Sequence, residues 1–115
     1  MEINLISDTV TKPSKDMLNF MYDCNVGDDV FKQDPTVNEL EKKVSSLFGM
    51  DCALFFPSGT MANQSAINIL TKPGDQLICS KYAHVYNYEG GGVSFNSGVS
   101  CKLIDKPRGL FNYED

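Results

Sequence analysis

One stretch of the chain joins an apolar run, a proline and a hydroxyl-rich turn. The run Leu54-Phe55-Phe56-Pro57 is followed by Ser58-Gly59-Thr60, after which the pattern predicts a helix. The first amides of a helix have no partner within it, and its dipole places roughly half a positive charge there. The glycine lets a ligand approach the backbone, and its two neighbours supply hydroxyls. The turn therefore either binds a phosphate or only caps its own helix.

The single histidine of the chain, His84, follows the predicted strand Gln76 to Cys79. Open α/β sheets bind ligands at the carboxyl ends of their strands, and Ser58-Gly59-Thr60 also follows such an end. An imidazole at this place could stack on a flat ring or transfer a proton. A lone histidine is also often a purely structural residue, so both interpretations stay open.

Two further polar clusters precede these segments. The cluster Ser7-Asp8-Thr9-Val10-Thr11 could present hydroxyls to a carboxylate, or form a turn that uses them locally. The cluster Gly27-Asp28-Asp29-Val30 is acidic, and acidic pairs in loops bind cations. It lacks a third oxygen ligand at suitable spacing, which favours a solvated loop or a subunit contact. No metal site is predicted here.

Composition excludes several classes of protein. The chain has 115 residues, which is at most one ordinary domain, and a net charge of −5. This acidic balance argues against nucleic acid or an anionic membrane as the main partner. No apolar stretch approaches the roughly 20 residues that cross a bilayer, and the N-terminus lacks the features of a secretory signal.

Cysteine usage indicates a reducing compartment. The four cysteines are far apart, with no Cys-x-x-Cys pair, and only one histidine accompanies them, so a zinc site is not expected. We expect the three that fall in predicted strands to be buried free thiols and the protein to be cytoplasmic. These three are Cys52, Cys79 and Cys101.

The remaining pattern predicts elements that alternate between helix and strand. Ser14 caps a helix that runs to about Asp23, and a loop from Asn25 to Gln33 precedes the start signal Asp34-Pro35. Gly49 ends that second helix. We expect buried strands at 52–56, 76–79 and 100–104, and helices at 61–71 and 82–89. This is an α/β layer architecture, and the tail at 106–115 suggests a part of a longer protein.

Four segments taken in order resemble the N-terminal part of the L-threonine aldolases. These enzymes belong to the β-eliminating lyase group of pyridoxal-phosphate enzymes, with the aspartate-aminotransferase fold (fold type I). The resemblance covers nearly the whole chain and implies that 1–115 is an N-terminal arm and the incomplete first part of a cofactor-binding large domain. The segments are Ser7 to Thr11, Gly27 to Val37, Pro57 to Met61, and His84 to the glycines after Glu89.

The resemblance implies a role for each segment. Ser58, Gly59 and Thr60 would form the phosphate cup for pyridoxal 5'-phosphate, and His84 would stack on its ring and act as a catalytic residue. Ser7 would help to hold the substrate carboxylate. The segment Gly27 to Val37 would lie near a subunit interface of a homo-oligomer with shared active sites. The implied reaction is cleavage of a β-hydroxy-α-amino acid to glycine and an aldehyde.

The chain also departs from this family. It has Phe31 where the family usually has tyrosine, and Lys32-Gln33 where it has glycine-glutamate. The family's imine-forming lysine, its aspartate facing the pyridine nitrogen and its carboxylate-binding arginines come later than position 115. No lysine of this chain has the matching context, so we expect the 115-residue chain alone to be inactive.

Two other interpretations remain. The chain is either a catalytically dead fragment that binds phosphate or pairs through an exposed sheet edge, or part of another pyridoxal-phosphate lyase or aminotransferase of the same fold. A turnover test of the 115-residue chain with added pyridoxal phosphate addresses the first alternative. A substrate panel on the longer parent protein addresses the second.

Overall fold

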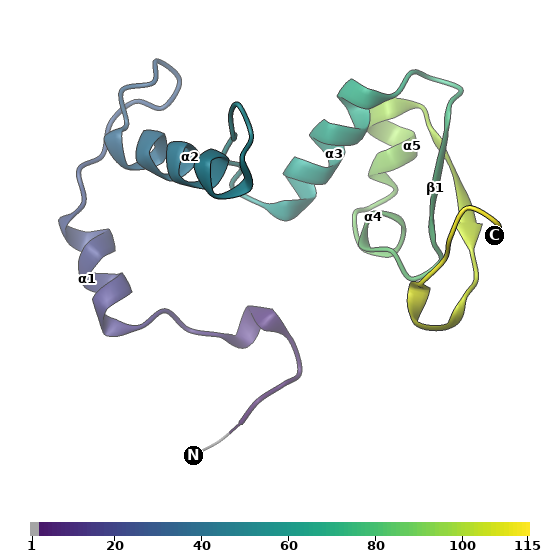
Figure 1. Ribbon diagram of the computed structural model, residues 1–115, viewed down its shortest axis with the longest axis horizontal. Coiled ribbons are helices and arrows are strands. Elements are labelled where there is room, and N and C mark those ends of the chain that lie inside the picture. The colour runs from purple at the N-terminus through teal and green to yellow at the C-terminus, as the bar shows by residue number, and fades with distance from the viewer. Residues whose placement is uncertain (1–2) are drawn as a thin grey trace. The chain divides into compact units, whose positions relative to one another are not determined.

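The computed structural model describes residues 3–115 of the chain (Figure 1). The chain divides after Phe55 into two compact units. The first unit holds a 3-10 helix and two α-helices, and the second holds two strands with the remaining helices. Their bounds are η1 (Asp8–Val10), α1 (Lys15–Asp23), α2 (Pro35–Phe48), α3 (Gly59–Leu70), β1 (Gln76–Ser80), α4 (His84–Asn87), α5 (Gly92–Ser97), β2 (Ser100–Ile104) and η2 (Pro107–Gly109).

Helices α1 and α2 begin and end where their capping residues predict. The Ser14 hydroxyl accepts a hydrogen bond from the Met17 amide at 3.2 Å and so caps α1. Helix α2 begins with a proline after Asp34 and ends at Gly49, which has φ of 64°. That left-handed conformation is one that glycine adopts at little cost. Both predicted helices are therefore confirmed.

Asp34 also holds the loop that precedes α2. One of its carboxylate oxygens accepts from the Thr36 and Val37 amides, and the other accepts from the Gly27 amide, each at 2.9 Å. The Val37, Gly27 and Thr36 amides lower the pKa of Asp34, although burial opposes them. A Cβ on Gly27 would lie 2.3 Å from the Gln33 carbonyl oxygen, so the loop closes tightly. The predicted loop over 25–33 is confirmed.

The predicted buried strand at 52–56 is wrong. Within the described residues, this segment has no regular secondary structure and belongs to no sheet. Leu54 and Phe55 are more than half exposed, and Cys52 is exposed too. A strand needs a hydrogen-bonding neighbour, and the Phe55 amide instead donates to the Glu41 carboxylate at 2.9 Å. An apolar run gives the burial expected of a strand but says nothing about which partner is available.

Strands β1 and β2 form a parallel pair in the second unit, with Gln76 opposite Ser100 and Ser80 opposite Ile104. Both predicted strands are confirmed, and so is a mixed α/β arrangement with a helical connection between them. Their predicted burial is not, since only Cys79 on β1 and Ile104 on β2 are buried. Helix α3 starts at Gly59, two residues before the predicted start, and α4 is a shorter helix than predicted over 82–89. Figure 1 shows α5 between α3 and the strands, and it contacts both α3 and β2.

The core of the second unit is small. Its buried apolar side chains come from β1, from α5, from the residue before β2 and from the end of β2, namely Cys79, Val93, Val99 and Ile104. Cys101 is only half-buried, so of the three thiols predicted to be buried only that of Cys79 is. In the described part of the chain, no helix has both the length and the apolar character to span a bilayer.

Candidate functional site

The turn before α3 is built as the sequence predicts. Ser58 is extended, with φ of −150°, and its hydroxyl accepts from the Met61 amide at 3.1 Å. The Ser58 carbonyl accepts the next amide, that of Ala62, at 3.1 Å. Ser58 is therefore the N-cap of α3, which is the capping role that the sequence left open beside phosphate binding. Its hydroxyl proton is still available to a ligand, since a hydroxyl donates as well as accepts.

Several donors at this turn have no partner among residues 3–115. They are the amides of Gly59 and Thr60 and the Thr60 hydroxyl, all at the exposed start of a 12-residue helix. A Cβ built on Gly59 would meet no heavy atom within 4 Å, so space lies open beside this backbone. Amides, hydroxyls and the positive end of a helix dipole suit a phosphate dianion. The residues present thus fit a phosphate group.

A polar hollow of about 570 Å³ adjoins the turn. Its walls come from the first three turns of α3 and from α5. Gln64 lies in this wall and also belongs to the hydrogen-bond network described next. The hollow is lined by Ser58, Thr60, Met61, Gln64, Ser65, Asn68 and Asn96.

His84 begins α4, and its ring is held by a buried glutamate. The Nδ1 atom lies 2.9 Å from the Glu89 Oε1 atom. The Glu89 side chain is 0% exposed, whereas that of His84 is 61% exposed. Tyr88 packs against the imidazole with 5.3 Å between ring centroids and a tilt of 45°. The imidazole is thus anchored at one nitrogen and accessible elsewhere.

Glu89 joins the histidine to α3. Its Oε1 atom also accepts from the Asn63 side-chain amide at 2.8 Å, and its Oε2 atom accepts from that of Gln64 at 2.6 Å. Burial alone would raise the pKa of Glu89, but the hydrogen bonds from Gln64, Asn63 and His84 outweigh burial and lower it. The carboxylate is therefore ionised and fully paired near neutral pH.

The network brings two of the predicted site segments together. Asn63 and Gln64 lie on the turn of α3 that follows Ser58-Gly59-Thr60. The Glu89 carboxylate therefore links His84 to the start of α3. Sequence reasoning missed Glu89, Asn63 and Gln64 as site residues. A carboxylate five residues after the histidine was a local signal for Glu89, but its amide partners lie 25 and 26 residues away.

Ser7, the predicted substrate-binding residue, belongs to the first unit. Its hydroxyl oxygen accepts from the Thr9 amide at 3.3 Å and from the Thr9 hydroxyl at 2.9 Å. The Ser7 hydroxyl lies 3.2 Å from an Asp8 carboxylate oxygen, to which it donates. The hydroxyl thus takes part in a local turn, the alternative that the sequence left open, and its role with substrate stays a prediction.

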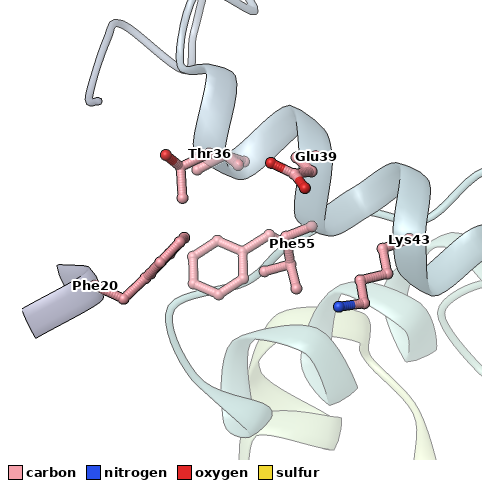
Figure 2. A pocket seen from close by; sticks show the side chains of 7 residues that line it. Phe20, Thr36, Glu39, Lys43 and Phe55 are labelled. Carbon is pink, nitrogen blue, oxygen red and sulfur yellow. The ribbon is translucent and has the colours of Figure 1, made fainter. Parts of the chain in front are cut away.

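An apolar pocket of about 320 Å³ lies in the first unit (Figure 2). Figure 2 shows Phe20 of α1 and Phe55 of the segment at 52–56 beside it, with Thr36, Glu39 and Lys43 of α2 around them. It lacks convergent polar groups of the kind that a small-molecule site uses. Among the described residues, no three histidine, cysteine, aspartate or glutamate side chains group as a metal site would require.

Comparisons with known proteins agree on one family. The family model described as beta-eliminating lyase matches residues 4–115. The chain is 42% identical over 103 residues to the low specificity L-threonine aldolase of Escherichia coli (strain K12), covering 90% of this chain and 31% of that protein. It is 38% identical over 103 residues to low-specificity L-threonine aldolase 1 of Arabidopsis thaliana, covering 89% and 29%.

A fungal relative extends the comparison. An aldolase of Penicillium aethiopicum is 41% identical over 106 residues, covering 91% of this chain and 27% of that protein. The chain thus spans about three tenths of the length of the curated relatives that it matches. The matched part includes every segment on which the resemblance rests.

Proposed function

Because the chain belongs to the beta-eliminating lyase family, we propose that the protein carrying it is a lyase that cleaves threonine-like β-hydroxy-α-amino acids to glycine and an aldehyde. Enzymes of this family depend on pyridoxal phosphate. One observation carries the proposal. The unpartnered donors at the start of α3 lie one helical turn from the residues that hold His84, so a phosphate cup and an imidazole share one site.

In this proposal, the turn Ser58-Gly59-Thr60 holds the cofactor phosphate. Two backbone amides and two hydroxyls donate to it, and the open space at Gly59 admits it. Hydrogen bonds to a charged group contribute about 1.5–3 kcal/mol each, so this turn would supply much of the affinity. His84 lies against the cofactor ring, where its exposed imidazole face is free to stack.

The proposed reaction breaks the Cα–Cβ bond of the substrate. A base takes the β-hydroxyl proton, the oxygen becomes the carbonyl oxygen of the aldehyde, and the bonding electron pair stays on the Cα fragment. Bound pyridoxal phosphate supplies an electron sink for that pair. Return of a proton to Cα gives glycine. The chain's own residues bind the phosphate, orient the breaking bond and accept a proton.

Further parts of the proposal rest on the family. Residues 1–115 form the N-terminal arm and the first part of a large domain of the aspartate-aminotransferase fold, and Ser7 helps to hold the substrate carboxylate. The protein is a homo-oligomer with shared active sites. Its four free thiols support a cytoplasmic location, because secreted proteins usually oxidise such cysteines.

Spectroscopy and turnover of the whole protein test the proposal. The purified protein with pyridoxal phosphate should absorb visible light and release glycine and acetaldehyde from threonine. A colourless protein that binds inorganic phosphate but releases no glycine would contradict the proposal. Faster β-elimination than Cα–Cβ cleavage across a substrate panel would assign the protein to another activity.

A further inference from the structure

We propose that Glu89 is a positioning residue that keeps the proton of neutral His84 on Nδ1 and so leaves Nε2 as a proton acceptor in the site. The relevance of this arrangement to catalysis rests on the proposed function, but the tautomer itself follows from the geometry of the chain. Which ring nitrogen of a histidine carries the proton is set by the hydrogen bond that the other makes.

The contact at Nδ1 requires a proton on that nitrogen. A carboxylate oxygen is an acceptor, so at 2.9 Å from Glu89 Oε1 the Nδ1 atom must donate. Glu89 has no exposed side-chain surface, and removing its partner would leave a buried charge with one fewer donor. Placing the His84 proton on Nε2 instead would set two lone pairs against each other at this distance.

The carboxylate is held in place by two amides. Asn63 and Gln64 donate to its two oxygens at 2.8 and 2.6 Å. The orientation of Gln64 is fixed from its other end, because its Oε1 atom accepts from the Asn96 side-chain amide at 3.3 Å. With three donors on two oxygens, the carboxylate has no free rotation and presents Oε1 to the imidazole. The ring plane of His84 is therefore set by α3.

Gly92 leaves the room that this arrangement needs. A Cβ at this position would lie 2.6 Å from both the Cδ and the Oε1 atoms of Gln64. The end of a glutamine side chain can usually move away from such a contact. Here it is tied to both Glu89 and Asn96, so moving it breaks a hydrogen bond. The glycine at the start of α5 thus leaves room for the hydrogen bonds that orient Glu89.

The consequence for the proposed reaction concerns one proton. Nε2 of His84 accepts the proton of a substrate hydroxyl, and the imidazole becomes an imidazolium. Glu89, at the opposite nitrogen, stabilises that positive charge without taking the proton itself. If the neutral ring carried its proton on Nε2, it would donate to the same hydroxyl instead.

Nitrogen NMR of the histidine ring tests the tautomer directly. The chain has one histidine, and the loss of its signal in a His84→Asn variant identifies it in the whole protein. With ¹⁵N-labelled histidine and the ring in its neutral form, the wild type should show the proton on Nδ1. Glu89→Gln should move the population toward the Nε2-protonated form. The matched Glu39→Gln variant, an exposed glutamate on α2, should leave it unchanged.

Two NMR results would contradict the proposed tautomer. Protonation of Nε2 in the wild type, or an unchanged tautomer in Glu89→Gln, would overturn the proposal. If Glu89→Gln fails to fold, the wild-type spectrum still decides, and Gly92→Ala gives a second perturbation of the same carboxylate. The measurement needs no cofactor and no turnover. A Nδ1 proton in a protein that cannot bind pyridoxal phosphate would therefore reject the proposed function and keep this inference.

Discussion

At the level of single residues, the hydroxyls of Ser58 and Thr60 differ in the hydrogen bonds that they already make. Ser58 caps α3 through the Met61 amide, so its replacement costs the helix about 1 kcal/mol as well as any ligand contact. Thr60 has no hydrogen-bond partner for its hydroxyl within residues 3–115. Thr60 is therefore the position where phosphate binding can be tested with little effect on folding.

We predict that Thr60→Val weakens pyridoxal phosphate binding while the melting temperature stays close to that of the wild type. Valine keeps the shape and loses one hydroxyl that would donate to a charged group, which is worth about 1.5–3 kcal/mol, or roughly tenfold to a hundredfold in affinity. Titration of the apoprotein, followed by visible absorbance, measures the affinity. An unchanged affinity would remove the Thr60 hydroxyl from the phosphate cup.

Glu89 makes stability depend on acid. Its pKa is lower in the folded chain than in the unfolded one, so its contribution is complete above the unfolded pKa and is lost as pH falls through the folded pKa. We predict that the wild type loses its advantage in unfolding free energy over Glu89→Gln as pH falls below about 4.3, the usual value for glutamate. Urea unfolding of both proteins between pH 7 and pH 3 measures this. A constant difference across that range would contradict the network.

At the level of elements, α5 offers a matched pair of glycines. Gly91 and Gly98 flank this helix in left-handed conformations, with φ of 71° and 65°. A Cβ on Gly91 would meet nothing within 4 Å, whereas one on Gly98 would lie 3.1 Å from the Pro73 side chain and 3.2 Å from its Cα atom. The two sites share the backbone cost and differ in crowding.

We therefore predict that Gly98→Ala destabilises the protein more than Gly91→Ala. Each pays about 1–2 kcal/mol for the left-handed conformation, and only Gly98→Ala also pushes against the backbone of Pro73. Chemical denaturation of the two variants beside the wild type gives the comparison. Equal losses would show that the turn at Pro73 yields easily.

The sequence alone predicts where helices begin and end more reliably than which elements pack against each other. Ser14, Asp34 and Gly49 act within a few residues of their own position, so local pattern predicted α1 and α2 correctly. Helix α5 was missed, because glycine, serine and valine are weak helix formers over only six residues. Its Val93 is buried, so tertiary packing stabilises it despite a weak propensity.

The same contrast holds for the site. The turn before α3 and the position of His84 after β1 are local features and were predicted. The glutamate that orients the histidine was not, because its partners on α3 lie far away in sequence. The supposed strand at 52–56 failed for the same reason, since pairing depends on a distant partner.

At the level of the whole molecule, little apolar surface is buried. Among the described residues, the largest side chain that is almost wholly enclosed is only a valine, Val99, and Ile78 on β1 is 56% exposed. Parallel sheets are normally covered on both faces and rarely have two strands. The sheet and its helices are thus suited to packing against further structure.

We predict that the 115-residue chain by itself binds a hydrophobic dye and unfolds without a sharp transition. Its exposed apolar side chains supply the dye sites, and a core of four apolar residues in the second unit gives little cooperativity. Fluorescence of anilinonaphthalene sulfonate and a calorimetric scan provide the readouts. A single sharp heat-absorption peak with no dye signal would show that the chain is self-sufficient.

Asp34 ties the amide of Gly27 to the first turn of α2, which closes the chain between them into a ring of covalent and hydrogen bonds. A ring of this kind tolerates exchange of its side chains but not a change in its circumference. Insertions and deletions among related chains should therefore fall outside 27–34. The segment at 52–56, held among the described residues only by the hydrogen bond that the Phe55 amide donates to the Glu41 carboxylate, should vary more freely in length.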